Sequence, residues 1–441
     1  MQAAQLKERL EDAGQGMFEL VRRLYPICRS ITGDGVRRTL KLLQEYIPLV
    51  THEIPSRTPV FDWTVPKEWN VADAYIRDPN GEKIADFQRC NLHVLNYSVP
   101  VKKKVYLNEL KAHTFTLPEH PDWIPYRTSY YKENWGFCLT HNQLQQLSEG
   151  EYEVSIDASL EDGHLTYGEC YLKGETDSEV LFSTHVCHPS LANDNLSGVA
   201  LAVFLAKHLS ELSLRYSYRF LFTPGTIGSI TWLSVNEARL SRIKHGLVLA
   251  CVGDPGNITY KKSRRGNAEI DHAVSQILKE TGEPHDIVDF SPYGYDERQF
   301  CSPGFNLPVG CFMRTPHGKF PEYHTSADNL ELVQPRYLGD SLSKCLTILR
   351  VIEGNRTYLN LNPKCEPQLG KRGLYGTIGG QADGRLHELA MLWVLNFSDG
   401  NHSLLDIAKK SALPFEIIKN SADRLVQHGL LTEVAKETPE P

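Results

Sequence analysis

The stretch "THVCHPSLANDNLSG" (residues 184–198) places two histidines, a cysteine and an aspartate between positions 185 and 194. It follows the apolar run "EVLFSTHV" (179–186), which is typical of a buried strand, and it leads into "SGVALAVFLAKHLSEL" (197–212), which has helical spacing. In α/β proteins, ligands bind beyond the carboxyl ends of the strands, where the loops carry the chemistry. The stretch therefore predicts a strand-to-helix connection that carries a functional site.

Strand and helix patterns continue to alternate up to about residue 355. The predicted strands are "YSYRFLFTP" (216–224), "HGLVLACVG" (245–253) and "LPVGCFM" (307–313). The predicted helices between them are "GSITWLSVNEARL" (228–240) and "GNAEIDHAVSQILKE" (266–280). Such alternation predicts an α/β/α sandwich with a mostly parallel sheet.

Local residue patterns divide the rest of the chain into helical and β-rich segments. Residues 15–47 read as two helices joined by "SITGDG", whereas residues from about 50 to 170 consist of short β-rich runs separated by Pro, Gly and Asn. The tail contains three helical patterns and then Gly429 and a short strand signal, which resembles a winged helix. We predict an α/β domain of residues 1–50 and 171–360, an inserted β-rich domain of 51–170, and a winged helix domain of 366–441.

Composition restricts the partners. The net charge of -7, from 47 basic and 54 acidic residues, argues against a general nucleic-acid binder. The third helical pattern of the tail mixes Glu416 and Asp423 with Lys419 and Arg424 and has no basic stripe. A structural or dimerisation role fits this pattern better than DNA binding, and a homo-oligomer is compatible with it.

No stretch approaches the roughly 20 apolar residues that span a bilayer, and the N-terminus has no signal-peptide pattern. We therefore expect a cytoplasmic protein that does not enter membranes. The 10 cysteines contain no CxxC pair, so most are expected to be buried thiols rather than disulfide partners.

Ligand-type side chains follow several predicted strands of the α/β domain: His185, His188, Asp194, Asp254 and His324. Zinc takes about four ligands from such residues, and a catalytic zinc keeps one position for water. Two plainer interpretations remain at this point. A loop histidine is often only solvated, and Asp194 could simply cap the helix that begins near Leu196.

Several longer motifs carry a family resemblance: "CHPSLANDNLSG" (187–198), "TIGSI" (226–230), "SRRGN" (263–267), "DERQFCSPGFNLPVG" (296–310) and "RTPHGKFPEYHTSADNL" (314–330). Together they resemble an aminopeptidase-like family of the di-zinc exopeptidase clan, with an inserted β-rich domain and a C-terminal winged helix. The resemblance implies a metallopeptidase that hydrolyses a short peptide or aminoacyl amide with zinc-activated water and binds one or two zinc ions.

Carried over by motif, the resemblance implies that His188, Asp194 and His324 are metal ligands. Asp254 is a weaker candidate because it lies a few residues beyond the clan's usual position. His185 competes with His188, since it stands at the strand end where the clan's first ligand falls. Cys187 then occupies the place of the aspartate that orients this histidine in the clan.

The expected catalytic glutamate is missing, because Gly225 stands directly before "TIGS". Losing a general base typically costs about 10² to 10⁴ in rate. The motifs offer Asp296, Glu297 and Glu322 as replacement carboxylates, although each could equally be structural. Arg265 and Tyr295 are candidates for substrate binding. The alternative function is a non-hydrolytic metal-binding or assembly protein that retains the peptidase fold.

Overall fold

A computed structural model describes residues 2–374 and 382–434. The chain forms two compact units, one of residues 1–268 with 284–343 and the other of residues 269–283 with 344–441. All of the candidate site residues lie in the first unit. The domain boundaries stated above remain a prediction.

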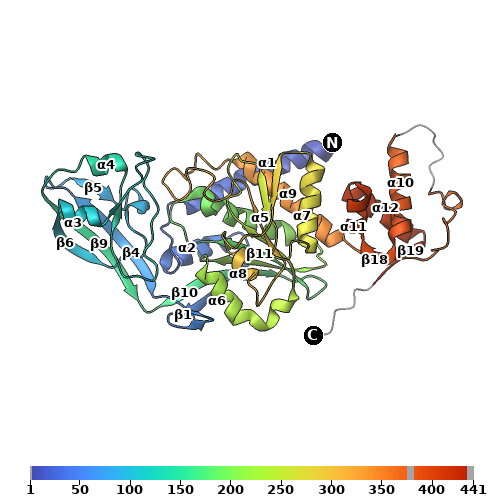
Figure 1. Ribbon diagram of the computed structural model, residues 1–441, viewed down its shortest axis with the longest axis horizontal. Helices are drawn as coiled ribbons and strands as arrows, with labels where there is room; N and C mark the ends of the chain where they lie inside the picture. The colour runs from blue at the N-terminus through green and yellow to red at the C-terminus, as the bar shows by residue number, and fades with distance from the viewer. Residues whose placement is uncertain (1, 375–381, 435–441) are drawn as a thin grey trace. The chain divides into compact units, whose positions relative to one another are not determined.

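The first unit is built on an eight-stranded sheet in the order β1-β10-β12-β11-β13-β16-β14-β15 (Figure 1). Its parallel centre consists of β12 (Ser217–Thr223), β11 (Glu179–His185), β13 (Ile243–Leu249) and β16 (Val309–Met313). The flanking strands are β1 (Val50–Pro55), β10 (His164–Leu172), β14 (Ile258–Lys261) and β15 (His285–Val288). The antiparallel pairs are β1 with β10, β10 with β12, and β14 with β16. The predicted α/β fold is confirmed, with a mixed sheet whose centre is parallel.

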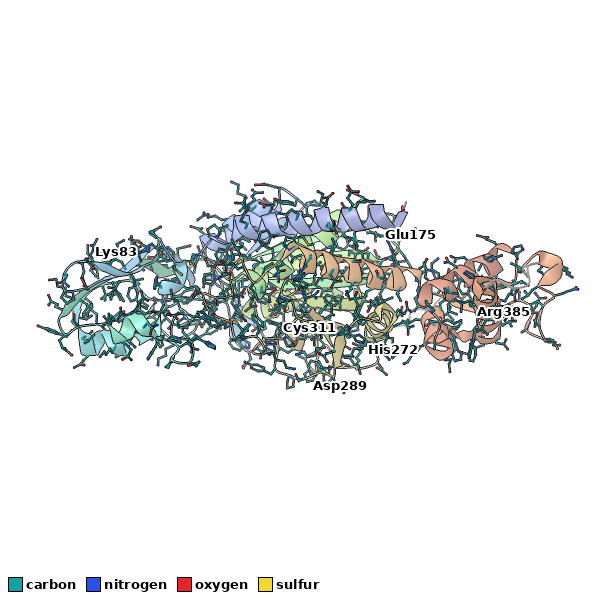
Figure 2. The ribbon with its side chains drawn as sticks, turned by 90° about the horizontal axis from the view of Figure 1, so that it is seen from above. Lys83, Glu175, His272, Asp289, Cys311 and Arg385 are labelled. Carbon is teal, nitrogen blue, oxygen red and sulfur yellow. The ribbon has the colours of Figure 1, made fainter. Side chains whose placement is uncertain are left out.

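The central strands are covered by helices, as their composition predicts. All seven residues of β11 and all seven of β12 are buried, which is typical of strands with both faces covered. Helix α5 (Gly198–Leu209) begins directly against the end of β13, because a Cβ at Gly198 would lie 2.5 Å from the Leu249 carbonyl oxygen. Cys311 of β16 lies inside this central body (Figure 2). The other helices of the unit include α1 (Gln2–Leu24), α2 (Asp34–Leu43) and α6 (Ile227–Asn236).

A second, four-stranded sheet lies within the first unit, beside α2 (Figure 1). Its strands are β5 (Lys83–Asp86), β4 (Glu68–Arg77), β9 (Glu151–Glu161) and β6 (Val101–Tyr106), all antiparallel. This is the predicted β-rich insertion. The strands β1 and β10, which lie at the two ends of the predicted range, pair in the large sheet. β-rich sequence alone does not show which sheet a strand joins.

The second unit contains the winged helix. Its strands β17 (Thr357–Asn360), β18 (Asp399–Ser403) and β19 (Leu431–Glu433) form one sheet with helices α10 (Ala382–Phe397), α11 (Leu404–Ser411) and α12 (Phe415–Gln427). The predicted turn after the third helix is present, since Gly429 adopts φ 66°, which favours glycine. The sheet includes β17, which precedes the predicted start at 366. Helices α7 (Glu269–Thr281) and the C-terminal part of α9 (Pro335–Gly354) also belong to this unit.

Two general expectations can be compared with the described residues. None of the helices in the described ranges is both long enough and apolar enough to cross a membrane. The cysteines are free thiols, and most of them are buried, with Cys28 and Cys90 half-buried and Cys365 exposed.

Candidate metal centre

Asp194 is the centre of the site. It lies in the segment Ala192–Ser197 between β11 and α5, and its side chain is fully buried. Asp328 holds this segment, because its carboxylate accepts hydrogen bonds from the backbone amides of Asn193 (2.6 Å) and Asp194 (2.9 Å). The Asp194 side chain does not cap α5. It faces a group of imidazoles instead.

Three histidines surround the Asp194 carboxylate. His185 Nε2 lies 2.8 Å from Oδ1, at the end of β11. On the other oxygen, Oδ2, His324 Nε2 lies at 3.0 Å and His188 Nε2 at 3.7 Å. The structure therefore brings together four of the five residues that the sequence offers as metal ligands.

Two atoms of this group are buried without a hydrogen-bond partner: Asp194 Oδ2 and His324 Nε2. They face each other, yet their geometry is not that of a hydrogen bond. A buried polar atom without a partner costs roughly 1–3 kcal/mol. Carboxylate oxygen and imidazole nitrogen are donors that zinc prefers, so these atoms fit a metal ion that both would contact.

The pKa shifts of Asp194 and His188 are consistent with a metal ion at these atoms. Burial alone would raise the pKa of Asp194, but the imidazoles of His188, His185 and His324 hold it well below its usual range. Burial lowers the pKa of His188 far below that of a free histidine. A carboxylate with a neutral imidazole is the protonation state in which these groups bind a metal.

Gly225 lies at the edge of this group. A Cβ at this position would be 3.1 Å from His185 Cβ and 3.4 Å from Asp296 Oδ1. Asp296 is 1% exposed, accepts a hydrogen bond from Ser229 Oγ (3.2 Å), and keeps Oδ2 without a partner. Burial, with a contribution from Glu297, raises the pKa of Asp296 to about 6. A carboxylate is therefore present beside the position where the family resemblance places a glutamate.

The contacts of Glu297 and Glu322, the other candidate bases, differ from those of Asp296. Glu297 is fully buried and forms an ion pair with Lys261. Glu322 contributes its backbone carbonyl, which accepts hydrogen bonds from the amide and hydroxyl of Thr325, next to His324. Asp296 is therefore the candidate base that the geometry favours.

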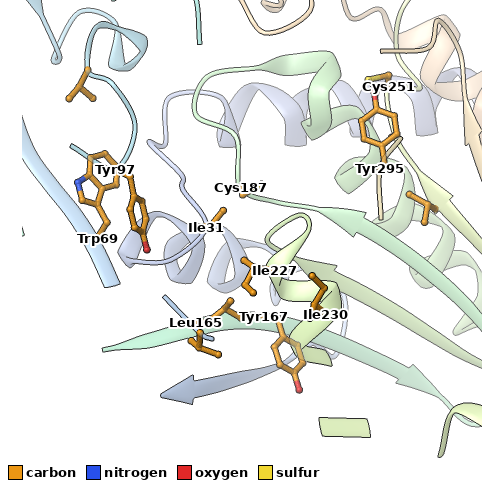
Figure 3. Packing of buried hydrophobic residues seen from close by; sticks show 14 of the residues in the cluster. Ile31, Trp69, Tyr97, Leu165, Tyr167, Cys187, Ile227, Ile230, Cys251 and Tyr295 are labelled. Carbon is orange, nitrogen blue, oxygen red and sulfur yellow. Dashed lines mark hydrogen bonds between the residues drawn. The ribbon is translucent and has the colours of Figure 1, made fainter. Parts of the chain in front are cut away.

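Tyr295 also lies at the centre. Its ring stacks on His185 with ring centroids 5.4 Å apart, and its hydroxyl is 3.0 Å from Cys251 Sγ, toward which it points in Figure 3. Cys251 Sγ in turn lies 3.9 Å from Asp194 Oδ1. The Tyr295 hydroxyl is thus engaged with a cysteine on the Oδ1 side of Asp194.

Two predicted site residues lie elsewhere. Asp254 accepts hydrogen bonds from Asn193 Nδ2 (3.0 Å) and from the Gly256 amide (2.8 Å), and it also bonds Thr315. These contacts give it a structural role behind Asn193. Arg265 donates to the Asn306 carbonyl (2.7 Å) and lines a separate hollow with Leu240 and Lys244.

Three residues that shape the centre were not predicted from the sequence: Asp328, Cys251 and Tyr126. Asp328 lies in the "SADN" motif that also marks His324, so its motif position was a usable signal. Cys251 lies inside the predicted strand 245–253, and only the observed end of β13 at Leu249 places it beyond the strand, where ligand-type residues are expected. Tyr126 comes from the insertion and packs on His188 and His324, and no local pattern indicates this contact.

Comparison with known families gives two matches. The model of a family described as a domain of unknown function, DUF4910, matches residues 18–355, and the model of a winged helix-turn-helix matches residues 356–433. A protein of Clostridium acetobutylicum is 57% identical over 420 residues, which covers 95% of this chain and 96% of the relative. The name of that protein refers to polysaccharide biosynthesis and to an aminopeptidase-like domain.

Solved structures extend the similarity. A crystal structure from Clostridium acetobutylicum, of a protein named as a peptidase, has a TM-score of 0.92 at 55% identity and covers 97% of this chain and 98% of that chain. A zinc aminopeptidase from Bacillus subtilis has a TM-score of 0.57 at 13% identity. The similarity covers 78% of this chain and 94% of that chain. At that identity the similarity concerns the fold alone. The fold of the chain is that of the zinc aminopeptidases, followed by a winged helix.

Proposed function

The chain belongs to the DUF4910 family, and from this premise we propose that it is a metal-dependent, aminopeptidase-like hydrolase of a short peptide or aminoacyl amide. One observation carries the proposal: the buried Oδ2 of Asp194 has no hydrogen-bond partner and faces the Nε2 atoms of His188 and His324. The zinc aminopeptidase fold and the aminopeptidase-like relative support it.

In this proposal His188, Asp194 and His324 hold a zinc ion, and His185 contacts the other oxygen of Asp194, where it either orients the carboxylate or adds a ligand. Three protein ligands leave a coordination position for water or substrate. When bound, zinc supplies Lewis acidity, which polarises a carbonyl and lowers the pKa of water to about 7.

Asp296 is assigned as the general base. It is the carboxylate nearest to the position of Gly225, and its Oδ2 has no other partner. It would accept the proton of the attacking water at Oδ2 and pass it to the leaving amine. Glu297 is less suited to this step because its Oε1 forms an ion pair with Lys261.

The second candidate is a non-hydrolytic metal-binding or assembly protein that retains the fold. Gly225 favours it, because an enzyme without the expected glutamate loses a base in the usual position. Both proposed functions require a bound metal, and they differ in whether the protein hydrolyses a substrate.

The test combines elemental analysis of the purified protein with a hydrolysis screen of aminoacyl-arylamide and dipeptide substrates. Zinc with turnover supports the hydrolase, whereas zinc without turnover supports the second candidate. Protein that takes up no zinc would overturn both. The variants His188→Ala and His324→Ala are expected to lose the metal, and His164→Ala, a half-exposed histidine on β10, serves as the matched control.

A further inference from the structure

We infer that the inserted β-rich domain helps to form the metal centre. It positions the ligands His188 and His324 through the side chain of Tyr126. The inference rests on the proposed metal site. It adds a role for the insertion, which lies outside the sheet that supplies the ligands.

The first contact is a short backbone pairing between the insertion and the loop of His324. The Tyr126 amide donates to the His324 carbonyl at 2.7 Å, and the Ser326 amide donates to the Ile124 carbonyl at 2.8 Å. The Ile124 amide also donates to Ser326 Oγ at 3.0 Å. His324 itself has φ 56°, a left-handed conformation that is uncommon for residues other than glycine. Such a conformation persists only where its surroundings hold it, and here the insertion supplies the hydrogen bonds.

The second contact is the ring of Tyr126, which is 5% exposed. Its centroid lies 5.0 Å from that of His188 and 5.1 Å from that of His324, with an edge-to-face angle of 84° to His324. One rigid side chain therefore packs against both imidazoles on the Oδ2 side of Asp194. Packing of this kind limits rotation of the rings and keeps their Nε2 atoms directed at the carboxylate.

The third contact reaches the backbone of His188. Arg29 Nε donates to the His188 carbonyl at 3.0 Å, and Asn96 of the insertion donates through Nδ2 to the Arg29 carbonyl at 3.2 Å. The Asn96 amide also donates to the Arg127 carbonyl at 2.9 Å, next to Tyr126. The insertion thus holds the loops of both histidines.

Because of these contacts, removing the Tyr126 ring is expected to weaken the binding of zinc. Loss of a residue that orients metal ligands typically weakens binding by about 10- to 100-fold. Tyr126→Leu removes the ring and keeps an apolar side chain, whereas Tyr126→Phe keeps the ring and removes only the hydroxyl, which pairs with the Tyr130 hydroxyl at 2.8 Å.

The experiment measures the zinc dissociation constant of full-length variants by competition with a chromophoric chelator. The visible spectrum of the cobalt-substituted proteins and the thermal unfolding of the metal-free proteins are recorded in parallel. We expect about 10- to 100-fold weaker zinc binding and an altered cobalt spectrum for Tyr126→Leu, and affinity within about threefold of the parent for Tyr126→Phe. Tyr152→Leu is the control, because Tyr152 is an equally buried tyrosine of the inserted sheet, on β9.

The outcomes separate this inference from the proposed function. If the parent protein binds no zinc, the proposed function fails. If the parent binds zinc and Tyr126→Leu binds it equally well, only the role of Tyr126 is overturned. An equal loss in Tyr152→Leu would show general destabilisation and would also overturn it. If Tyr126→Leu does not fold, Ser326→Ala, which removes the acceptor of the Ile124 amide, is expected to weaken zinc binding, and parent-like affinity would contradict the inference.

Discussion

Gly225 faces Asp296 at the edge of the proposed metal centre, with its missing Cβ 3.4 Å from the Asp296 carboxylate. The two residues come from different loops, one after β12 and the other before β16. A carboxylate therefore remains at this edge of the site, although the loop that the family resemblance assigns to it contributes only glycine. This relationship leads to the first two predictions.

Asp296→Asn is expected to reduce kcat/KM for an aminoacyl arylamide by about 10² to 10⁴, because the amide cannot accept a proton. Zinc content should not change, since Asp296 is not among the proposed ligands. Asp289→Asn is the control, as that side chain is 88% exposed. Full activity in Asp296→Asn would remove Asp296 from the mechanism.

Gly225→Glu is expected to restore hydrolysis in the Asp296→Asn background, because the new carboxylate enters the same space. In the parent background the gain should be smaller, since two carboxylates at this separation tend to share one proton. The measurement is kcat/KM of both variants after zinc loading. A lack of gain in the double variant, with folded and metal-loaded protein, would contradict the idea that the two positions substitute for each other.

Metal removal is expected to lower thermal stability. A ligand that binds only the folded state stabilises it by about 2.7 kcal/mol at a concentration 100 times its dissociation constant. Scanning calorimetry with EDTA and with added zinc checks this, and His324→Ala should abolish the difference. An unchanged melting temperature in the parent protein would count against a folded-state metal site.

The insertion is attached to α2 by an ion pair whose strength should depend on pH. Arg37 donates to both oxygens of Glu68, at 2.6 and 2.7 Å, and this hydrogen bonding lowers the Glu68 pKa from 4.5 to about 2. The ionised Glu68 carboxylate stabilises the fold above pH 4.5, and this contribution is lost as the pH falls toward 2.

Glu68→Gln should therefore cost about 1–2 kcal/mol at pH 7, an amount reduced for partial solvent screening, and little at pH 2. Urea unfolding at several pH values measures the difference, with Glu149→Gln, an exposed glutamate, as the control. A cost that does not change with pH would contradict the ion-pair assignment.

The winged helix is expected to show no salt-sensitive affinity for duplex DNA. On α12, Lys419 is neutralised by Asp423 at 2.6 Å, and Glu416 offsets Arg424, so the helix offers no cationic stripe for phosphates. Fluorescence anisotropy with random and genomic duplexes at low and high salt tests this. Tight, sequence-selective binding would reverse the expectation.

The strands and helices around the site could be predicted because their signals are local. The apolar runs that form β11, β12, β13 and β16 are short and bounded, and the helices between them show clear periodicity. The ligand-type residues were identified for the same reason, since they follow strand ends. The sequence did not indicate which sheet each β-rich run joins, because β1 and β10 have the same β-rich composition as the inserted strands but pair in the large sheet.

By itself, the sequence determined the fold class and the residue types at the centre, because periodicity, strand ends and motifs depend on neighbouring residues. Only the tertiary structure decided which side chains meet. It placed His185, His188 and His324 around Asp194, set Asp254 and Arg265 apart, and brought Asp296 beside Gly225 and Tyr126 onto the imidazoles. These contacts join segments far apart in the chain, and their distances depend on how the strands pair and how the insertion packs, which no local pattern records.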